Sequence, residues 1–131
     1  MCDSVVLLIS KEAESLSESL TPILEADFSI QIVENLRAAE PFLDPKSPPA
    51  VVVVDARKLE AEAIRPIIIQ ILNKCALTQV TVISKIEGEE FHETMEGLGM
   101  LPPLPEEPTK ADVQALVEKV QRLMGTHYTS H

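Results

Sequence analysis

Polar side chains that could do chemistry follow three apolar runs of the sequence, at the point where each run ends: Ser10 and Lys11, Asp55, and Ser84 and Lys85. The most informative of them is Asp55, which closes the stretch "AVVVVD". An aspartate at the end of a buried strand can be a reactive carboxylate, a metal ligand or a helix cap. Its role depends on the side chains that neighbouring strands bring to the same edge of a sheet.

Apolar residues alternate along the chain between short runs, which indicate buried strands, and stripes at helical spacing, which indicate helices. Strands are predicted at residues 5–9, 28–33, 51–54, 79–84 and 100–101. Helices are predicted at residues 16–24, 36–43, 64–75, 91–98 and 109–124. Pro66 is acceptable only if it lies in the first turn of its helix.

The repeated order of strand and helix predicts an α/β fold, with a doubly wound parallel sheet of five strands and helices on both faces. We expect one domain over residues 1–124. Residues 125–131 are predicted to form a flexible tail, because Gly125 is unfavourable in a helix.

The composition disfavours several classes of partner and site. The formal net charge of −10 argues against nucleic acid, whose binding needs clustered lysine and arginine, and against an anionic membrane surface. Cys2 and Cys75 are too few for a disulfide framework or a metal site, and no apolar run is long enough to span a membrane. We therefore expect a cytoplasmic protein with reduced thiols, no metal and no cofactor.

The element order and the polar positions together resemble the response-regulator receiver (CheY-like) family, the phospho-acceptor domains of two-component signalling. The resemblance covers roughly residues 4–124. It rests on Asp55 after the third strand, Ser84 after the fourth, and the stretch "GLGMLPPLP" at residues 97–105. It implies a flavodoxin-like fold with Asp55 at the phospho-acceptor position and Ser84 at the hydroxyl position beside it.

The sequence departs from the family's pattern where the family supports phosphoryl transfer. An acidic pair after the first strand holds Mg²⁺ in the family, whereas Ser10 and Lys11 stand here, with Glu12 as the nearest acid. The family's phosphoryl-binding lysine falls on Leu104, and its aromatic switch residue falls on Leu101. The resemblance therefore implies a degenerate member, a pseudo-receiver, that has lost its metal site and its phosphoryl-binding cation.

We interpret the chain as a stand-alone, non-enzymatic signalling or scaffolding module that acts by protein contact and independently of phosphorylation. In this hypothesis Lys11, in preference to Lys85, pairs with Asp55, because an unpaired buried carboxylate is costly. Two alternatives remain: a genuine two-component phospho-acceptor that uses Asp55, with Glu12 recruiting Mg²⁺, and an anti-sigma-antagonist-like α/β regulator. Asp55 as a plain helix cap or an ion-paired strand end is a further interpretation.

Two surfaces are predicted to contact a protein partner. Ile69 lies off the core stripe of its helix and should point away from the sheet, next to Pro66. The second surface includes Leu101, Lys119 and Arg122, on the side where receivers commonly pair. Its mixture of basic and acidic side chains is compatible with a homodimer about a two-fold axis.

Overall fold

The computed structural model describes residues 5–12, 14, 28–44, 46, 48–75, 78–86, 88–94, 97, 101 and 103–128. The helix predicted at residues 16–24 lies outside these residues. Within the described part of the chain, no helix combines the length and the apolar character that crossing a bilayer requires.

The centre of the molecule is a parallel sheet of four strands in the order β2-β1-β3-β4. The strands are β1 (Val5–Ile9), β2 (Ser29–Val33), β3 (Val51–Asp55) and β4 (Gln79–Ile83). Their apolar runs pair in register, so that Leu8 lies opposite Val53 and Asp55 lies opposite Ile83. The α/β fold class and the positions of these four strands were predicted correctly.

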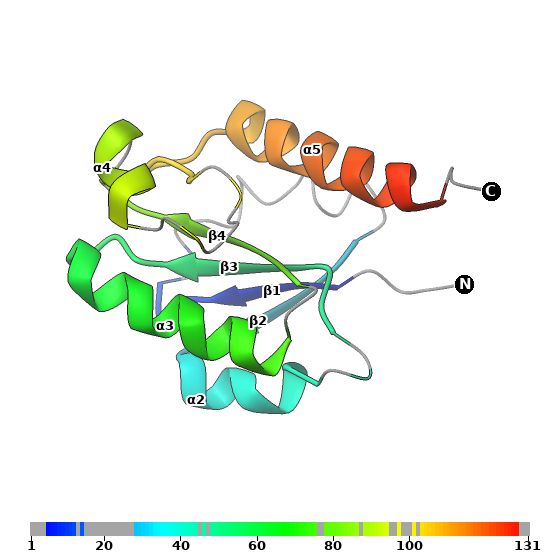
Figure 1. The fold of residues 1–131 in the computed structure, drawn as a ribbon, viewed down its shortest axis with the longest axis horizontal. Helices are drawn as coiled ribbons and strands as arrows, with labels where there is room; N and C mark the ends of the chain where they lie inside the picture. The colour runs from blue at the N-terminus through cyan, green and yellow to red at the C-terminus, as the bar shows by residue number, and fades with distance from the viewer. Residues whose placement is uncertain are drawn as a thin grey trace.

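Both faces of the sheet are covered, because successive side chains of a strand point to opposite faces. One core contains Leu7, Val52 and Val80 and packs against the α2 and α3 side. The other contains Val6, Val53 and α5 residues such as Val117. In Figure 1, α2 and α3 lie on one side of the sheet and α5 lies on the other, which is the doubly wound arrangement.

The described helices are α2 (Leu36–Ala39), a 3₁₀ turn η2 (Glu40–Phe42), α3 (Ala61–Lys74), α4 (Gly88–Thr94) and α5 (Lys110–Tyr128). Thr109 and Asp112 cap α5 reciprocally: the amide of Asp112 donates to Thr109 Oγ1 at 3.2 Å, and the amide of Thr109 donates to Asp112 Oδ2 at 2.9 Å. Such reciprocal bonds satisfy backbone donors that the first turn of a helix leaves unpaired.

Helix boundaries differ from the prediction in α3, in α5 and in α4, which begins at Gly88 instead of residue 91. Pro66 lies in the interior of α3, because α3 begins at Ala61, before the first apolar residue of its stripe. α5 continues through Gly125 to Tyr128, so the predicted start of the tail is wrong as a helix boundary. A glycine disfavours a helix by only about 1 kcal/mol relative to alanine and leaves the hydrogen-bond ladder intact.

The fifth strand predicted at residues 100–101 is not formed at Leu101. The segment beside β4 instead makes one parallel bridge, between Leu104 and Ile83. The amides of Leu101 and Leu104 donate to the carbonyls of Val80 and Val82 at 2.9 and 2.8 Å. Prolines fill positions 102 and 103, and their missing N–H groups prevent a continuous ladder.

Candidate functional site

Asp55 is the last residue of β3, and its side chain lies at the edge of the sheet where the parallel strands end. The ladder with β4 continues one residue further, since the amide of Ala56 donates to the carbonyl of Ile83 at 2.9 Å. The side chain of Asp55 is 10 % exposed. A carboxylate so little exposed needs hydrogen-bonding partners in the protein.

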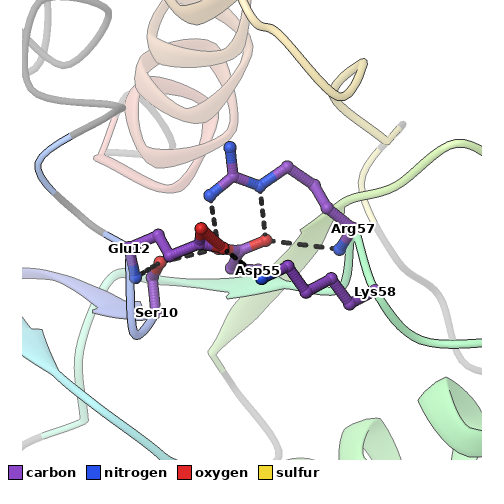
Figure 2. A network of polar contacts seen from close by, with 5 residues as sticks. All are labelled: Ser10, Glu12, Asp55, Arg57 and Lys58. Atoms are coloured by element: carbon purple, nitrogen blue, oxygen red, sulfur yellow. Dashed lines mark hydrogen bonds and ion pairs between the residues drawn. The ribbon is translucent and has the colours of Figure 1, made fainter.

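Arg57 is the main partner of this carboxylate. Its Nε donates to Asp55 Oδ1 at 2.8 Å and its Nη2 donates to Oδ2 at 2.7 Å, so the guanidinium binds both oxygens side by side. The backbone amide of Arg57 also donates to Oδ1, at 3.2 Å. Figure 2 shows the guanidinium lying across the carboxylate.

Ser10, at the end of β1, completes the contacts of Asp55. Its hydroxyl donates to Asp55 Oδ2 at 2.6 Å and accepts from the amide of Glu12 at 3.0 Å. The strand order places β1 next to β3, so the ends of the two strands meet. The Ser10 hydroxyl thus links the turn after β1 to the end of β3 (Figure 2).

These contacts determine the charge state of the site. Burial alone would raise the pKa of Asp55, but the hydrogen bonds from Arg57 and Ser10 outweigh it, and the net effect lowers the pKa. The bond to Asp55 raises the pKa of Arg57 in turn. At neutral pH the pair is therefore a carboxylate and a guanidinium.

The predicted lysine partners are not the ones that Asp55 uses. Lys11 is exposed and makes no ion pair within the described residues, and Lys85 lies 3.9 Å from Glu60. Asp55 does pair with a cationic side chain, as predicted, but that side chain is Arg57 and not a lysine. Ser10 and Arg57 already occupy the carboxylate, so Lys11 remains in solvent.

Sequence reasoning missed Arg57, although the sequence holds a signal for it. An aspartate side chain often accepts from the backbone amide two residues on, and this turn brings the side chain of that residue close to the carboxylate; Arg57 stands at that position after Asp55. The fork of an arginine also matches a carboxylate better than the single charge of a lysine does. The motif "DAR" at residues 55–57 was therefore a better candidate than the more distant lysines.

Ser84, at the end of β4, is buried and bonds locally. Its hydroxyl accepts from the amide of Ile86 at 3.0 Å, and its own amide donates to the carbonyl of Leu104 at 3.0 Å. Ser84 thus lies at the same edge of the sheet as Asp55, next in register, as predicted. Among the contacts resolved for the described residues, none joins its hydroxyl to Asp55.

The donor set around Asp55 does not fit a Mg²⁺ ion. Such an ion prefers several oxygen ligands, usually carboxylates and waters. Here a guanidinium and a hydroxyl donate to the two oxygens of Asp55, and the nearest acid, Glu12, pairs with Lys58 at 3.0 Å. The described residues contain no group of three or more acidic, histidine or cysteine side chains that could hold a metal.

Of the four side chains assigned to contact surfaces, three are exposed and one is buried. Ile69 is 36 % exposed and points away from the core, as expected. Lys119 and Arg122 are also exposed, on α5. Leu101 is 3 % exposed and packs in the core beneath α5, because its amide ties it to β4; its assignment to a contact surface is wrong.

No protein-family model matches the sequence, and no curated protein matches it significantly. Solved structures do match. A response regulator from Thermotoga maritima has a TM-score of 0.75 and 17 % identity, over 90 % of this chain and 97 % of its own. The signal receiver domain of a putative LuxO repressor from Vibrio parahaemolyticus has a TM-score of 0.76 and 14 % identity, over 98 % of both chains.

The chain has the receiver fold. An orphan response regulator of Helicobacter pylori matches it as well, with a TM-score of 0.66 and 19 % identity over 91 % of this chain and 94 % of its own. The receiver fold confirms the prediction made from element order and from the positions of Asp55 and Ser84. It also favours the receiver interpretation over an anti-sigma-antagonist-like fold.

Proposed function

We propose that this chain is a signalling or scaffolding module with a receiver fold, which acts by contact with a protein partner and without phosphorylation of Asp55. In this proposal it is not an enzyme, and it binds neither nucleic acid nor membrane. The receiver fold supports a role in signalling. The contacts of Asp55 support independence from phosphorylation.

The observation that carries the proposal is the occupation of the Asp55 carboxylate. A phospho-acceptor attacks phosphorus with a carboxylate oxygen, and that oxygen must be accessible to the incoming group. Both oxygens of Asp55 already accept charge-assisted bonds from Arg57, and Oδ2 accepts a further bond from Ser10. Phosphorylation would break these bonds and leave the guanidinium without its carboxylate.

The surroundings of Asp55 add a second line of support. Catalysis of phosphoryl transfer depends on cations that neutralise the charge on the transferring group. The position where the family has its lysine holds Leu104, which is 7 % exposed and packs in the apolar core under α5. The Arg57 guanidinium is already engaged by Asp55 itself.

Protein contact is the mode of action that the surface favours. The outer side of α3 exposes Pro66, Ile69, Gln70 and Asn73, none of which carries a charge. The exposed face of α5 carries Lys119 and Arg122, which are compatible with an acidic partner surface or with self-pairing. A chain with a net charge of −10 is poorly suited to bind nucleic acid or an anionic membrane.

A genuine phospho-acceptor is the alternative, favoured by the position of Asp55 at the end of β3 with Ser84 beside it on β4. In that case Arg57 would have to leave Asp55 before each transfer.

The two functions differ in how partner binding depends on Asp55. We expect the protein to capture the same partner from its native host whether it carries Asp55 or the isosteric Asp55→Asn. A Lys74→Gln variant, which alters an exposed charge remote from the site, is the matched control. A partner that binds only after treatment with a phosphodonor, and never to Asp55→Asn, would establish the phospho-acceptor function instead.

A further inference from the structure

A cleft of about 390 Å³ lies beside Asp55, on the side of the sheet that α2 and α3 cover. Its floor is aliphatic and consists of Ile9, Leu36, Val54, Leu59 and Ile67. All five belong to, or pack against, the core between the sheet and these helices. Arg57, in contrast, does not line the cleft.

The cleft lies where this type of fold opens a natural crevice. From β1 the chain moves outward to β2, and from β3 it moves in the opposite direction to β4, so the connections diverge at the ends of β1 and β3. Ligands of open parallel sheets bind at such switch points. The volume and the apolar lining are also typical of small-molecule sites, which hold about 300 to 1,000 Å³.

The rim of the cleft carries charges of both signs, and most of them are already neutralised. Lys58 pairs with Glu12 at 3.0 Å, and Asp55 is bound by Arg57. Two charged rim residues remain, Lys11 and Glu34, whose side chains make no hydrogen bond or ion pair within the described part of the chain.

Lys11 and Glu34 are neighbours on this rim. Lys11 follows Ser10 and Glu34 follows Val33, and the amide of Ser10 donates to the carbonyl of Val33 at 2.8 Å. The cleft therefore presents one ammonium and one carboxylate on adjacent segments of its rim, above an aliphatic floor. A ligand with a single charge would satisfy one of these groups and face a like charge on the other.

We propose that this cleft binds a free α-amino acid with an apolar side chain. The ligand's carboxylate pairs with Lys11, its ammonium pairs with Glu34, and its side chain packs on the aliphatic floor. The two rim charges are exposed and the ligand is small, so we expect a dissociation constant on the order of 1 mM. This site is independent of the proposed protein contact and can be tested on the isolated protein.

The test titrates ¹⁵N-labelled protein with L-phenylalanine to about 10 mM and follows amide chemical shifts. Two analogues separate the charges: N-acetyl-L-phenylalanine lacks the ammonium, and L-phenylalaninamide lacks the carboxylate. We expect saturable shifts around residues 9–11, 34–36 and 58–59 with L-phenylalanine, and weaker binding of both analogues.

Variants that remove one charge each test the two proposed ion pairs with the ligand separately. Lys11→Gln should weaken the binding of L-phenylalanine and of its N-acetyl analogue about two- to five-fold, as expected for the loss of an exposed ion pair. It should leave the affinity for L-phenylalaninamide unchanged. Glu34→Gln should weaken the binding of L-phenylalanine and of L-phenylalaninamide by a similar factor. It should leave the affinity for the N-acetyl analogue unchanged. Lys110→Gln and Glu107→Gln, exposed and outside the cleft, are the matched controls and should change nothing.

A variant of the floor tests the apolar half of the site. Leu36→Trp should fill the cleft and abolish binding, whereas Ile69→Trp, on the outer side of α3, should not. Circular dichroism checks that both variants fold. The proposal is overturned if no saturable shift occurs, if the shifts map away from the cleft, or if the amide binds as tightly as L-phenylalanine. The last result would indicate the N-terminus of a peptide as the ligand.

Discussion

The carboxylate of Asp55 has both oxygens engaged by neighbouring side chains, and this arrangement has an energetic consequence. Removing one member of a buried ion pair leaves an uncompensated charge, which is more costly than removing the whole pair. Asp55 is 10 % exposed and Arg57 is 17 % exposed, so water screens the pair only partly. The two residues should therefore be strongly coupled in their effect on stability.

A double-mutant cycle measures this coupling. We expect Arg57→Met to lower the free energy of unfolding by about 2 to 4 kcal/mol, because it leaves the Asp55 carboxylate without a cationic partner. Adding Asp55→Asn should recover part of that loss, with a coupling energy of about 1 to 3 kcal/mol. Urea denaturation at pH 7 is the measurement.

Lys11→Met is the matched control for this cycle. Because Lys11 is exposed and does not pair with Asp55, its removal should change the free energy of unfolding by less than about 0.5 kcal/mol. Strict additivity of the Arg57 and Asp55 variants, or coupling of Asp55 to Lys11, would contradict the observed arrangement.

The lowered pKa of Asp55 predicts how stability depends on pH. A carboxylate whose pKa is depressed by folding adds stability above its unfolded pKa of about 3.9, and this stability is lost as pH falls through the folded pKa. The wild type should therefore exceed Asp55→Asn in unfolding free energy by a constant amount from pH 7 to about pH 5. Below about pH 4 the difference should shrink. A difference that grows on acidification would mean that folding raises this pKa.

At the scale of single residues, the sequence predicted the position of Asp55 and its need for a cation, but not which cation. The strand end follows from the valine run, whereas the choice among Lys11, Arg57 and Lys85 depends on turn geometry. Ser10 was predicted as a polar residue at the right edge. Its bond to Asp55 was missed, because the adjacency of the two strands does not by itself decide whether Ser10 or Lys11 faces the carboxylate.

The elements of the fold were predictable where one signal dominated. Apolar runs located β1, β3 and β4, because a strand buried on both faces needs apolar residues at successive positions. The same reasoning gave a wrong strand near residue 100. Leu101 and Leu104 are buried like strand residues, but the prolines between them limit the pairing with β4 to one bridge. The length of α5 was underestimated because one glycine was given too much weight.

Pro66 lies inside α3, and its replacement tests how much this proline costs the helix. Its ring removes the hydrogen bond that position 66 would give to the carbonyl of Glu62 inside α3, and the residue itself is exposed. We expect Pro66→Ala to raise the free energy of unfolding by about 1 to 2 kcal/mol. The recovered helix interior is partly offset by the greater freedom of the unfolded chain.

Thermal or urea denaturation measures this change. Ala63→Gly, on the same exposed side of α3, is the control. It disfavours the helix and should lower the free energy of unfolding by about 1 kcal/mol. A loss of stability in Pro66→Ala would mean that the proline ring makes contacts that outweigh the missing hydrogen bond.

Over the whole molecule, the receiver fold and the groups around Asp55 depend on different parts of the sequence. The parallel order β2-β1-β3-β4 and the covered faces depend on apolar patterning, which the chain keeps. The donor set at the strand ends is independent of that patterning, so it can change without loss of the fold. This separation is why the apolar pattern predicted the fold but carried no information about the partner of Asp55.

We propose that Asp55 is an ion-paired residue and not a phospho-acceptor. Intact-mass spectrometry after incubation with acetyl phosphate and Mg²⁺ tests it most directly, with Asp55→Asn in parallel and an active receiver as the positive control for the reagent. We predict no added phosphoryl mass on the wild type under conditions that modify the active receiver. A stoichiometric phosphoryl adduct on the wild type that is absent from Asp55→Asn would contradict the claim.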